Sequence, residues 1–485
     1  MPKVKHTILP PYRNADVISN TNSMYKIQDG TMQQTKEGQI VLAKRFGATS
    51  WVDLALSDPI DGVHWFESLN KGIVVSGAKV YTIDDSAGAT TDITADAPEY
   101  GQKCTFAEVW DAVANETRLF IASGGQILWT NGTTTAYATG NIAPTRCTHV
   151  AQVDTYLCFN DLDTPGFWKH SVVEEPTNLD SGSGARTMTA QRIPDDIVAV
   201  FALSNKLYVC GTRSIEVWQN VGDTIPFASL NLTIESGLNS GTSVSTYLGT
   251  AMLFSDTKRL IRLDGYTPNI ISEAYQAILD ASGSATSIET EFVAIDGGKV
   301  FLLIRMQDQN TTVVYDVLQQ VFYEWGKWNS STNQYSSFYG RCYAYMKSWG
   351  LHVIGDATTA KVYKVSDSYY DDNGDTIKSY FEFGNVDHGS STYKISNSLY
   401  VNTKRGTGLS GNTAAVAALQ WRDDGNQPYG NIVDLDLGVP GDAQMPVRLS
   451  RMGRYRSRQF KITMGQDSDF VFLGFEEDVY DSGRI

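Results

Sequence analysis

The sequence predicts an all-β protein built around a β-propeller of six or seven blades, and two observations lead to this fold class. Apolar residues almost never recur at helical spacing, whereas short alternating or apolar runs bounded by Gly, Asn, Asp and Ser recur from about residue 50 to 370. These runs also fall into repeated groups, each with one strand rich in aromatic and β-branched residues. Such strands begin at Val80, Ile127, Gly166, Ile215, Leu260, Val313 and Lys361.

The spacing of these strands is typical of propeller blades. By subtraction, successive starts lie 47, 39, 49, 45, 53 and 48 residues apart, and a blade of three or four strands takes about 40 to 50 residues. One blade cannot bury both of its faces, so blades stack around an axis and close into a ring. A pair of β-sandwiches with regularly spaced strands is the alternative that this periodicity leaves open.

Two flanks lie outside the repeats and predict a β-sandwich platform. Residues 1–48 carry only modest strand signal, and in residues 371–485 the strands become longer, as in the run 393–403. We therefore expect the propeller over 49–370 and a platform built from both flanks. Within the propeller, the polar stretch 173–194 predicts a loop that projects from the ring. Its candidate docking residues are Glu174, Glu175, Asp180, Arg186 and Arg192.

Composition narrows the function. Hydrophobic residues make up 42% of the 485-residue chain, which is enough for a large core. The 39 Lys and Arg against 54 Asp and Glu leave a net charge of -15, which disfavours general binding to nucleic acid. No apolar run approaches the ~20 residues of a membrane span. The basic start lacks the apolar segment of a secretory signal, so we expect a protein made in a cytosol.

Residue types suited to catalysis or metal binding form no recognisable motif. The histidines show no paired spacing, and the five cysteines show no zinc spacing. The acids of 370–375 surround an Asn-Gly pair, which favours a hairpin turn over a calcium loop. We therefore expect no enzyme activity, no cofactor and no metal. The abundant aromatic residues leave a glycan-binding propeller or a glycosidase open as the alternative. The histidines are His6, His64, His149, His170, His352 and His388.

One basic stretch stands out in this acidic chain. Its candidate interface residues are Arg448, Arg451, Arg454, Arg456 and Arg458, together with the later acids Glu476, Glu477 and Asp478. In one continuous strand, Arg454, Arg456 and Arg458 would share a face with the apolar residues that follow at 460, 462 and 464. A simple hairpin after 465–468 would bring the acids opposite the arginines. We expect cross-strand or intersubunit ion pairs, while contact with a partner ring and direct DNA contact stay open.

The C-terminal residues resemble a known family. The runs WRDDGNQPYGNI (421–432), RLSRMGRYRSRQFKITM (448–464) and DFVFLGFEEDV (469–479) resemble the end of the tail hub proteins of short-tailed bacteriophages. These proteins are also called packaged DNA stabilization proteins or tail nozzles. The triplet Asn-Ala-Asp at 14–16 is similar to the opening of that family. The strongest similarity covers only about sixty residues.

The resemblance implies a structural virion protein of the tail, made in the host cell cytoplasm. Such a protein forms a homo-hexameric ring below the portal and a head-to-tail adaptor ring, retains the packaged DNA and carries the genome out during ejection. Tailspikes or tail fibres on the outer face, and a plug or needle at the distal end, are the further partners it implies. Viral DNA would pass through the channel without sequence-specific binding.

Overall fold

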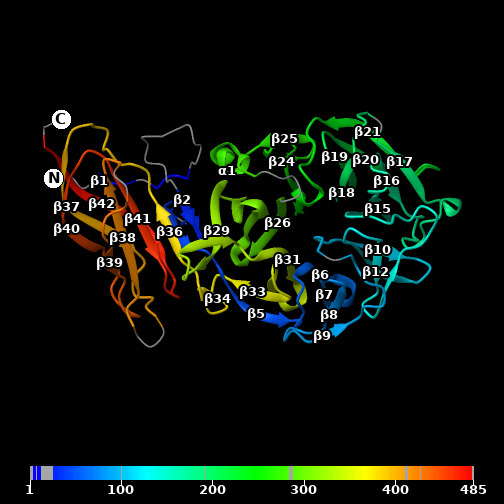
Figure 1. Ribbon diagram of the computed structural model, residues 1–485, viewed down its shortest axis with the longest axis horizontal. Helices are drawn as coiled ribbons and strands as arrows, with labels where there is room; N and C mark the ends of the chain where they lie inside the picture. Colours follow the sequence, from blue (N-terminus) through cyan, green and yellow to red (C-terminus); the bar gives the residue numbers. More distant parts are fainter. Residues whose placement is uncertain are drawn as a thin grey trace.

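The computed structural model consists of a ring of β-strands with a β-sandwich at one end (Figure 1). It describes residues 4–6, 8–11, 26–35, 37–99, 101–190, 192–282, 288–409, 413–425 and 428–482. The triplet at 14–16 that contributed to the family resemblance lies outside these residues. In Figure 1 the ring runs from blue through cyan and green to yellow, and the sandwich combines dark blue with orange and red segments.

Seven four-stranded units make up the ring in the described part of the chain. Blade 1 comprises β6 (Ile60–Phe66), β7 (Lys71–Ser76), β8 (Lys79–Ile83) and β9 (Thr90–Asp92). Blade 2 comprises β10 (Thr105–Asp111), β11 (Glu116–Ala122), β12 (Leu128–Thr130) and β13 (Thr135–Tyr137). Blade 3 comprises β14 (Val150–Val153), β15 (Tyr156–Asn160), β16 (Phe167–His170) and β17 (Arg186–Thr189).

The remaining blades repeat this antiparallel order. Blade 4 comprises β18 (Ile197–Leu203), β19 (Lys206–Gly211), β20 (Ile215–Asn220) and β21 (Phe227–Ile234). Blade 5 comprises β22 (Val244–Tyr247), β23 (Thr250–Phe254), β24 (Leu260–Asp264) and β25 (Thr267–Ile270). Blade 6 comprises β26 (Ile288–Ile295), β27 (Lys299–Met306), β28 (Thr311–Asp316) and β29 (Val321–Asn329). Blade 7 comprises β31 (Gly340–Met346), β32 (Leu351–Asp356), β33 (Lys361–Ser366) and β5 (Gly47–Asp53).

The ring is closed by a strand from the other end of the propeller sequence. β5 pairs antiparallel with β33, from Lys361 opposite Asp53 to Ser366 opposite Gly47, and so supplies the fourth strand of blade 7. The first strand of blade 7, β31, also packs against β6 of blade 1. Because one blade combines strands from both ends, the ring cannot open without breaking a sheet. The predicted propeller is confirmed, and it has seven blades.

Apolar side chains fill the spaces between the blades. Six clusters of buried residues each join two consecutive blades, as where Trp168 of blade 3 packs against Trp218 of blade 4. The cluster between blades 6 and 7 differs, since it continues into the sandwich and includes Trp325 of blade 6 and Phe460 of the sandwich. The sandwich is therefore built onto the propeller through a shared core.

The sandwich consists of two sheets that draw strands from both chain ends. One sheet has the order β3 (Gly30–Gln34), β4 (Ile40–Lys44), β42 (Val471–Asp481), β37 (Lys394–Thr403), β40 (Val447–Tyr455), with β1 (Val4–Lys5) beside β42. The other has the order β2 (Lys26–Gln28), β36 (Ser379–Glu382), β41 (Arg458–Met464), β38 (Val416–Asp423), β39 (Val433–Asp436). β2 also pairs in parallel with β29, so this sheet continues blade 6. The predicted fold class, a propeller flanked by a sandwich of both termini, is confirmed.

A buried arginine lies where the two regions meet. Arg45, between β4 and β5, is fully buried and pairs through Nε with Asp29 Oδ1 at 2.8 Å and through Nη2 with Asp372 Oδ2 at 2.5 Å. Its Nη2 also donates to the carbonyl of Gly326, in β29 of blade 6. Burying charge is costly unless the charge is paired and hydrogen-bonded, as it is here. One side chain thus connects the sandwich with blades 6 and 7.

Short elements complete the fold. β30 (Gln334–Ser337) pairs antiparallel with the end of β29. β34 (Asp371–Asp372) pairs with β35 (Asp375–Thr376) in the predicted hairpin. Asn373 and Gly374 have φ of 54° and 89°, as a tight turn requires. No helix of the described residues is long and apolar enough to cross a membrane. The helical elements are α1 (Gln276–Asp280), η1 (Glu67–Leu69), η2 (Ser181–Ser183), η3 (Gly241–Ser243), η4 (Glu273–Tyr275), η6 (Asp296–Gly298), η7 (Gln307–Gln309) and η8 (Lys347–Trp349).

Candidate interaction surface

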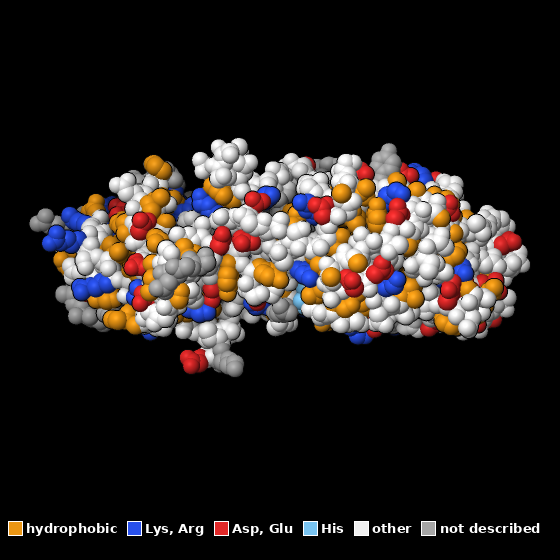
Figure 2. Space-filling model, turned by 90° about the horizontal axis from the view of Figure 1, so that it is seen from below, with side chains coloured by type: hydrophobic (Ala, Val, Ile, Leu, Met, Phe, Trp, Pro, Cys, Tyr) orange, Lys and Arg blue, Asp and Glu red, His pale blue; other side chains and the backbone are white. Residues whose placement is uncertain are grey.

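The sandwich ends in an arginine-rich edge strand. β40 pairs with β37 and with no other described strand, so its outer edge is open. Arg448, Arg451 and Arg454 of this strand are exposed, as is Arg456 just after it, and none of the ion pairs between described residues includes them. Basic side chains gather at this end of the molecule (Figure 2). We call these four arginines the arginine edge.

Aromatic rings hold part of the arginine edge in place. The guanidinium carbons of Arg454 and Arg456 lie 3.9 Å and 4.5 Å from the ring centre of Tyr393, and that of Arg448 lies 5.6 Å from Tyr400. Cation–π contact orients a guanidinium without neutralising it. Three of the four arginines therefore present positive charge in an oriented position on an acidic protein.

The basic stretch is two strands in different sheets, so the predicted continuous strand is wrong. β40 ends at Tyr455 and β41 begins at Arg458, while Asp424 Oδ1 accepts from the backbone N–H groups of Arg456 and Ser457 at 2.8 Å and 2.9 Å. This turn moves the chain from one sheet to the other. The prediction that alternate residues share one face holds only from Arg458 onward, since Arg458 lies on the same buried face as residues 460, 462 and 464.

The predicted hairpin between the last two strands is also wrong. β41 pairs with β36 and β38, whereas β42 pairs with β37, β4 and β1 in the facing sheet. The two strands instead meet across the core, where the rings of Phe460 and Phe475 lie 4.8 Å apart. In β42, Glu476 reaches Lys5 at 3.7 Å, and Asp478 lies opposite Ser398 of β37. The acids therefore do not face the arginine edge.

Two of the predicted interface residues are buried inside the sandwich. Arg458 and Glu477 have fully buried side chains, with Arg458 Nη1 3.9 Å from Glu477 Oε1. Arg458 pairs with Asp423 through Nε at 2.6 Å and Nη2 at 2.9 Å, and Nη2 also donates to the carbonyl of Met452. Burial removes both residues from any surface contact. Interface roles for the arginine edge, Glu476 and Asp478 stay predictions.

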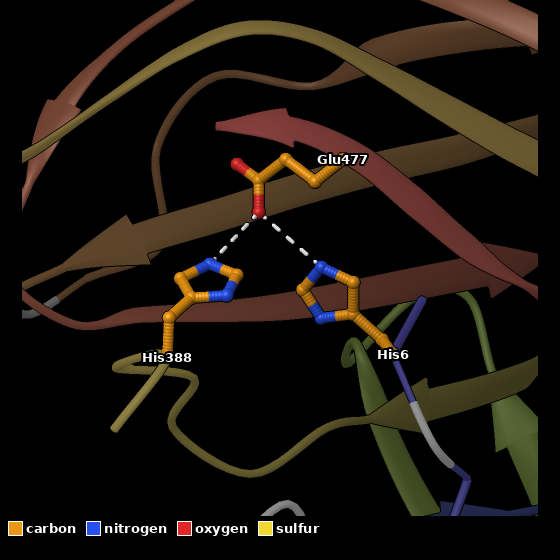
Figure 3. Close-up of side chains that lie close together, drawn as sticks. All are labelled: His6, His388 and Glu477. Atoms are coloured by element: carbon orange, nitrogen blue, oxygen red, sulfur yellow. Dashed lines mark ion pairs between the residues drawn. The ribbon is translucent and has the colours of Figure 1, made fainter. Parts of the chain in front are cut away.

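Two histidines from distant parts of the chain converge on Glu477 (Figure 3). His6 Nε2 and His388 Nε2 lie 3.2 Å and 3.3 Å from the same atom, Glu477 Oε2. Burial by itself would raise the pKa of Glu477, but contacts with His388 and His6 outweigh it and hold that pKa well below its usual range. Sequence reasoning missed this group because His6 lies 382 residues before His388, which in turn lies 89 residues before Glu477, so no spacing motif marks them.

The stretch 173–194 is a loop only in part, and its projection from the ring stays a prediction. It supplies β17, the outer strand of blade 3, and its first part bonds back to blade 2, where Ala112 N–H donates to the carbonyl of Glu174. Outer strands of a blade are half exposed, which explains their polar sequence. The candidate side chains serve local turns, since Glu175 accepts from Asn178 and Asp180 from the Gly182 N–H. Arg186 lies in β17, the Arg192 N–H donates to Glu216, and docking stays a prediction.

A cavity of about 850 Å³ lies where the first strands of the blades meet. Charged side chains that line this cavity form two close pairs. His64 Nε2 lies 2.9 Å from Glu108 Oε1, and Lys103 Nζ lies 2.6 Å from Glu291 Oε2. Burial lowers the pKa of His149, a further lining residue, to about 4, so this imidazole is neutral at pH 7. The two ion pairs join different blades, since Glu108 lies in blade 2 and Glu291 in blade 6.

Comparison with known proteins gives one strong match. A family model described as "Bacteriophage P22 Gp10, beta-propeller" matches residues 29–370. No curated protein matches. Solved structures similar to the chain include a Cps50 (Swd1) β-propeller domain from Myceliophteria thermophila, with TM-score 0.43, 8% identity and coverage of 66% of this chain and 99% of that chain. The Neurospora crassa Pan2 WD40 domain has TM-score 0.40, 6% identity and coverage of 66% and 94%.

Proposed function

The chain belongs to the family of the bacteriophage P22 Gp10 β-propeller and is a structural component of a phage virion; from this premise we propose that it is the tail nozzle, or tail hub. In this proposal six copies form a ring below the adaptor and extend the DNA channel. The ring retains the packaged genome and conducts it out during ejection. Tailspikes or fibres dock on the propellers, and a plug or needle closes the distal end.

The observation that carries the proposal is the arginine edge on an acidic chain. Three of its exposed arginines lie on a strand whose outer edge is open and the fourth directly follows that strand, while the chain as a whole has a net charge of -15. An open edge strand offers unpaired backbone groups, and the positive side chains beside it favour an acidic neighbour. Another copy of the chain is such a neighbour, and the adaptor ring is the second surface that this edge would contact.

The connection between the two regions supports a division of roles. The sandwich shares a core with blades 6 and 7, and β2 continues the sheet of blade 6. A sandwich held in this way can carry ring contacts while the propeller extends outward from it. We assign the subunit and adaptor contacts to the sandwich and the docking of spikes or fibres to the propeller.

The charge of the chain suits a conduit for DNA. Six copies would carry a formal charge of -90, six times -15. Each phosphate contact with Lys or Arg would add a salt-dependent attraction that slows transit. We expect the purified ring to show no appreciable affinity for duplex DNA at physiological salt in a mobility-shift assay. Tight binding that weakens steeply with added salt would contradict this role of the charge.

Electron microscopy of the assembled ring tests the proposal. The purified protein mixed with the adaptor protein of the same phage should give ring-shaped particles with sixfold symmetry in negative stain. The double substitution Arg454→Glu and Arg456→Glu should reduce the yield of rings about tenfold or more, because it reverses two charges of the arginine edge. Arg213→Glu, at an exposed arginine of the propeller, is the matched control and should assemble normally.

Two outcomes would contradict the proposal. If the wild-type mixture gives no rings under conditions where both proteins are folded, the nozzle assignment is wrong. If rings form equally well with both arginines reversed, the arginine edge is not the subunit or adaptor contact. Circular dichroism of each variant confirms that a loss of rings is not a loss of folding.

A further inference from the structure

We propose that His6, His388 and Glu477 form a Zn²⁺ site that fastens the N-terminal segment to the sandwich. The ligands would be the Nε2 atoms of the two histidines and Oε2 of the glutamate (Figure 3). Two imidazoles and one carboxylate are a donor set that Zn²⁺ accepts in proteins. The site is separate from the arginine edge and does not depend on the proposed nozzle function.

The distances between the three atoms fit a tetrahedral ion. His6 Nε2 and His388 Nε2 lie 3.2 Å and 3.3 Å from Glu477 Oε2, and all three atoms lie within 4.8 Å of one another. Ligands about 2.0–2.1 Å from Zn²⁺ at tetrahedral angles are about 3.3 Å apart. Two edges of the tetrahedron therefore already have the required length.

The state of the His6 imidazole points to a missing ligand. Its side chain is 8% exposed, yet no described group completes an aligned hydrogen bond to Nε2, although the Glu477 carboxylate is near. A buried polar atom without an aligned partner calls for an explanation, and a bound ion is one. A metal ion between Nε2 and the carboxylate would use the nitrogen lone pair directly. The His388 side chain is 12% exposed, so water can supply the fourth ligand.

Neighbouring side chains form the outer shell that a metal site needs. Tyr455 Oη lies 2.9 Å from both oxygens of Glu477 and 2.9 Å from His388 Nε2. With His388 Nε2 and Glu477 Oε2 bound to the ion, its hydroxyl would donate to Oε1. The rings of Phe460 and Phe475 lie edge-on to His6, each with its centre 5.9 Å from the imidazole centre. These groups orient the ligands and limit access of solvent.

The local charge balance permits a divalent cation. Arg458 is the one cation within 4.0 Å of Glu477 other than the histidines, among described residues, and Asp423 neutralises it through two contacts. With neutral imidazoles the group then retains the negative charge of Glu477. A Zn²⁺ ion would balance that charge inside the sandwich.

Such an ion would join three distant segments. His6 directly follows β1, His388 lies between β36 and β37, and Glu477 lies in β42. The backbone already brings them together, since β1 pairs with β42 and the His6 N–H donates to the carbonyl of Phe475. A metal bond would hold the short strand β1, which has only two residues, in a position that its own hydrogen bonds stabilise weakly.

Zinc binding by the full-length protein tests the proposal. After removal of metal with a chelator, titration calorimetry at pH 7.5 should show one Zn²⁺ bound per chain. His6→Gln and His388→Gln should each weaken binding by about 100-fold or more, and Tyr455→Phe by about tenfold, as for an outer-shell partner. His64→Gln removes a histidine that also pairs with a glutamate, Glu108, and should leave binding unchanged.

A second measurement uses only the unmodified protein, in case a variant does not fold. X-ray absorption at the zinc edge should show nitrogen and oxygen neighbours at about 2.0–2.1 Å with the signature of two imidazoles. Zinc should also slow hydrogen exchange in β1. The proposal is overturned if the wild type binds no Zn²⁺, if binding is the same in the His6→Gln/His388→Gln double variant, or if the spectrum shows sulfur ligands.

Discussion

The propeller and the sandwich are both made of β-strands, but they are assembled in opposite ways. In blades 1 to 6 the four strands of a blade follow one another along the chain, joined by short turns. In the sandwich, β42 pairs with β37 and also with β4, more than 400 residues earlier. The propeller therefore depends mostly on local pairing, and the sandwich depends on contacts between distant segments.

Blade 7 and the junction show how the two kinds of assembly are combined. β5 closes the ring from the N-terminal side, and the same segment leads directly from β4 of the sandwich through Arg45. A break at this point should affect both regions, whereas a break inside one blade should stay local. This difference gives three predictions for the free energy of unfolding.

The largest effect is expected at the junction. Arg45→Met should lower the free energy of unfolding by about 3–5 kcal/mol, because it leaves the buried carboxylates of Asp29 and Asp372 without their cation. Urea denaturation measures the loss. Hydrogen exchange should become faster in the sandwich and in blade 7 together.

The control for this substitution is an exposed pair in the same area. Lys327→Met removes a cation that lies 2.8 Å from Asp375, with about half of each side chain exposed, and should cost less than about 1 kcal/mol. If Arg45→Met costs no more than this control, or if only one region exchanges faster, the junction does not couple the two regions.

The propeller was predictable because strands within each of blades 1 to 6 pair with strands of the same blade that are close in the sequence. Alternating residues and turn signals recur within each blade, so the spacing of strands such as the one at Val80 was enough to predict the repeat. The hairpin at Asn373 and Gly374 was predicted for the same reason. Within 173–194 the prediction missed only the strand β17, because the half-exposed outer strand of a blade has the polar composition of a loop.

The sandwich and the site within it were less predictable because pairing between distant strands leaves no local mark. The alternation through Arg454 and Arg456 suggested one continuous strand, but Asp424 turns the chain into the facing sheet. The predicted hairpin of β41 and β42 was wrong because these strands lie in facing sheets and their apolar faces meet across the core. Nothing near His6 in the sequence indicates His388, so their meeting at Glu477 emerged only from the fold.

A smaller and purely local effect is expected inside blade 3. Burial by itself would raise the pKa of Asp161, but hydrogen bonds from Lys169 at 2.5 Å and Thr164 at 2.8 Å outweigh it and lower that pKa. Asp161→Asn should lower the free energy of unfolding by about 1.5–3 kcal/mol near pH 7. Faster hydrogen exchange should be confined to blade 3 and its neighbours.

The pH dependence of this effect has a definite sign. Because the pKa of Asp161 is lowered in the folded protein, its stabilisation is fully present above the unfolded pKa of about 3.9 and is lost as pH falls through the lower folded value. The difference between wild type and Asp161→Asn should thus be constant from pH 6 to 8 and shrink below about pH 4. Asp92→Asn, at an exposed pair with Lys79, should cost under about 1 kcal/mol. A difference that grows on acidification would contradict the assignment.

The smallest effect is expected at the arginine edge. Tyr393→Ala should lower the free energy of unfolding by only about 0.5–1 kcal/mol, because it removes the ring beneath Arg454 and Arg456 but no buried charge. Tyr393→Phe keeps the ring and should match the wild type in urea denaturation. Exchange in blades 1 to 5 should not change in either variant. Equal losses in both variants would mean that the hydroxyl, not the stacked ring, orders these arginines. A loss above about 2 kcal/mol in Tyr393→Ala would mean that the ring contributes to the packing of the sandwich core as well.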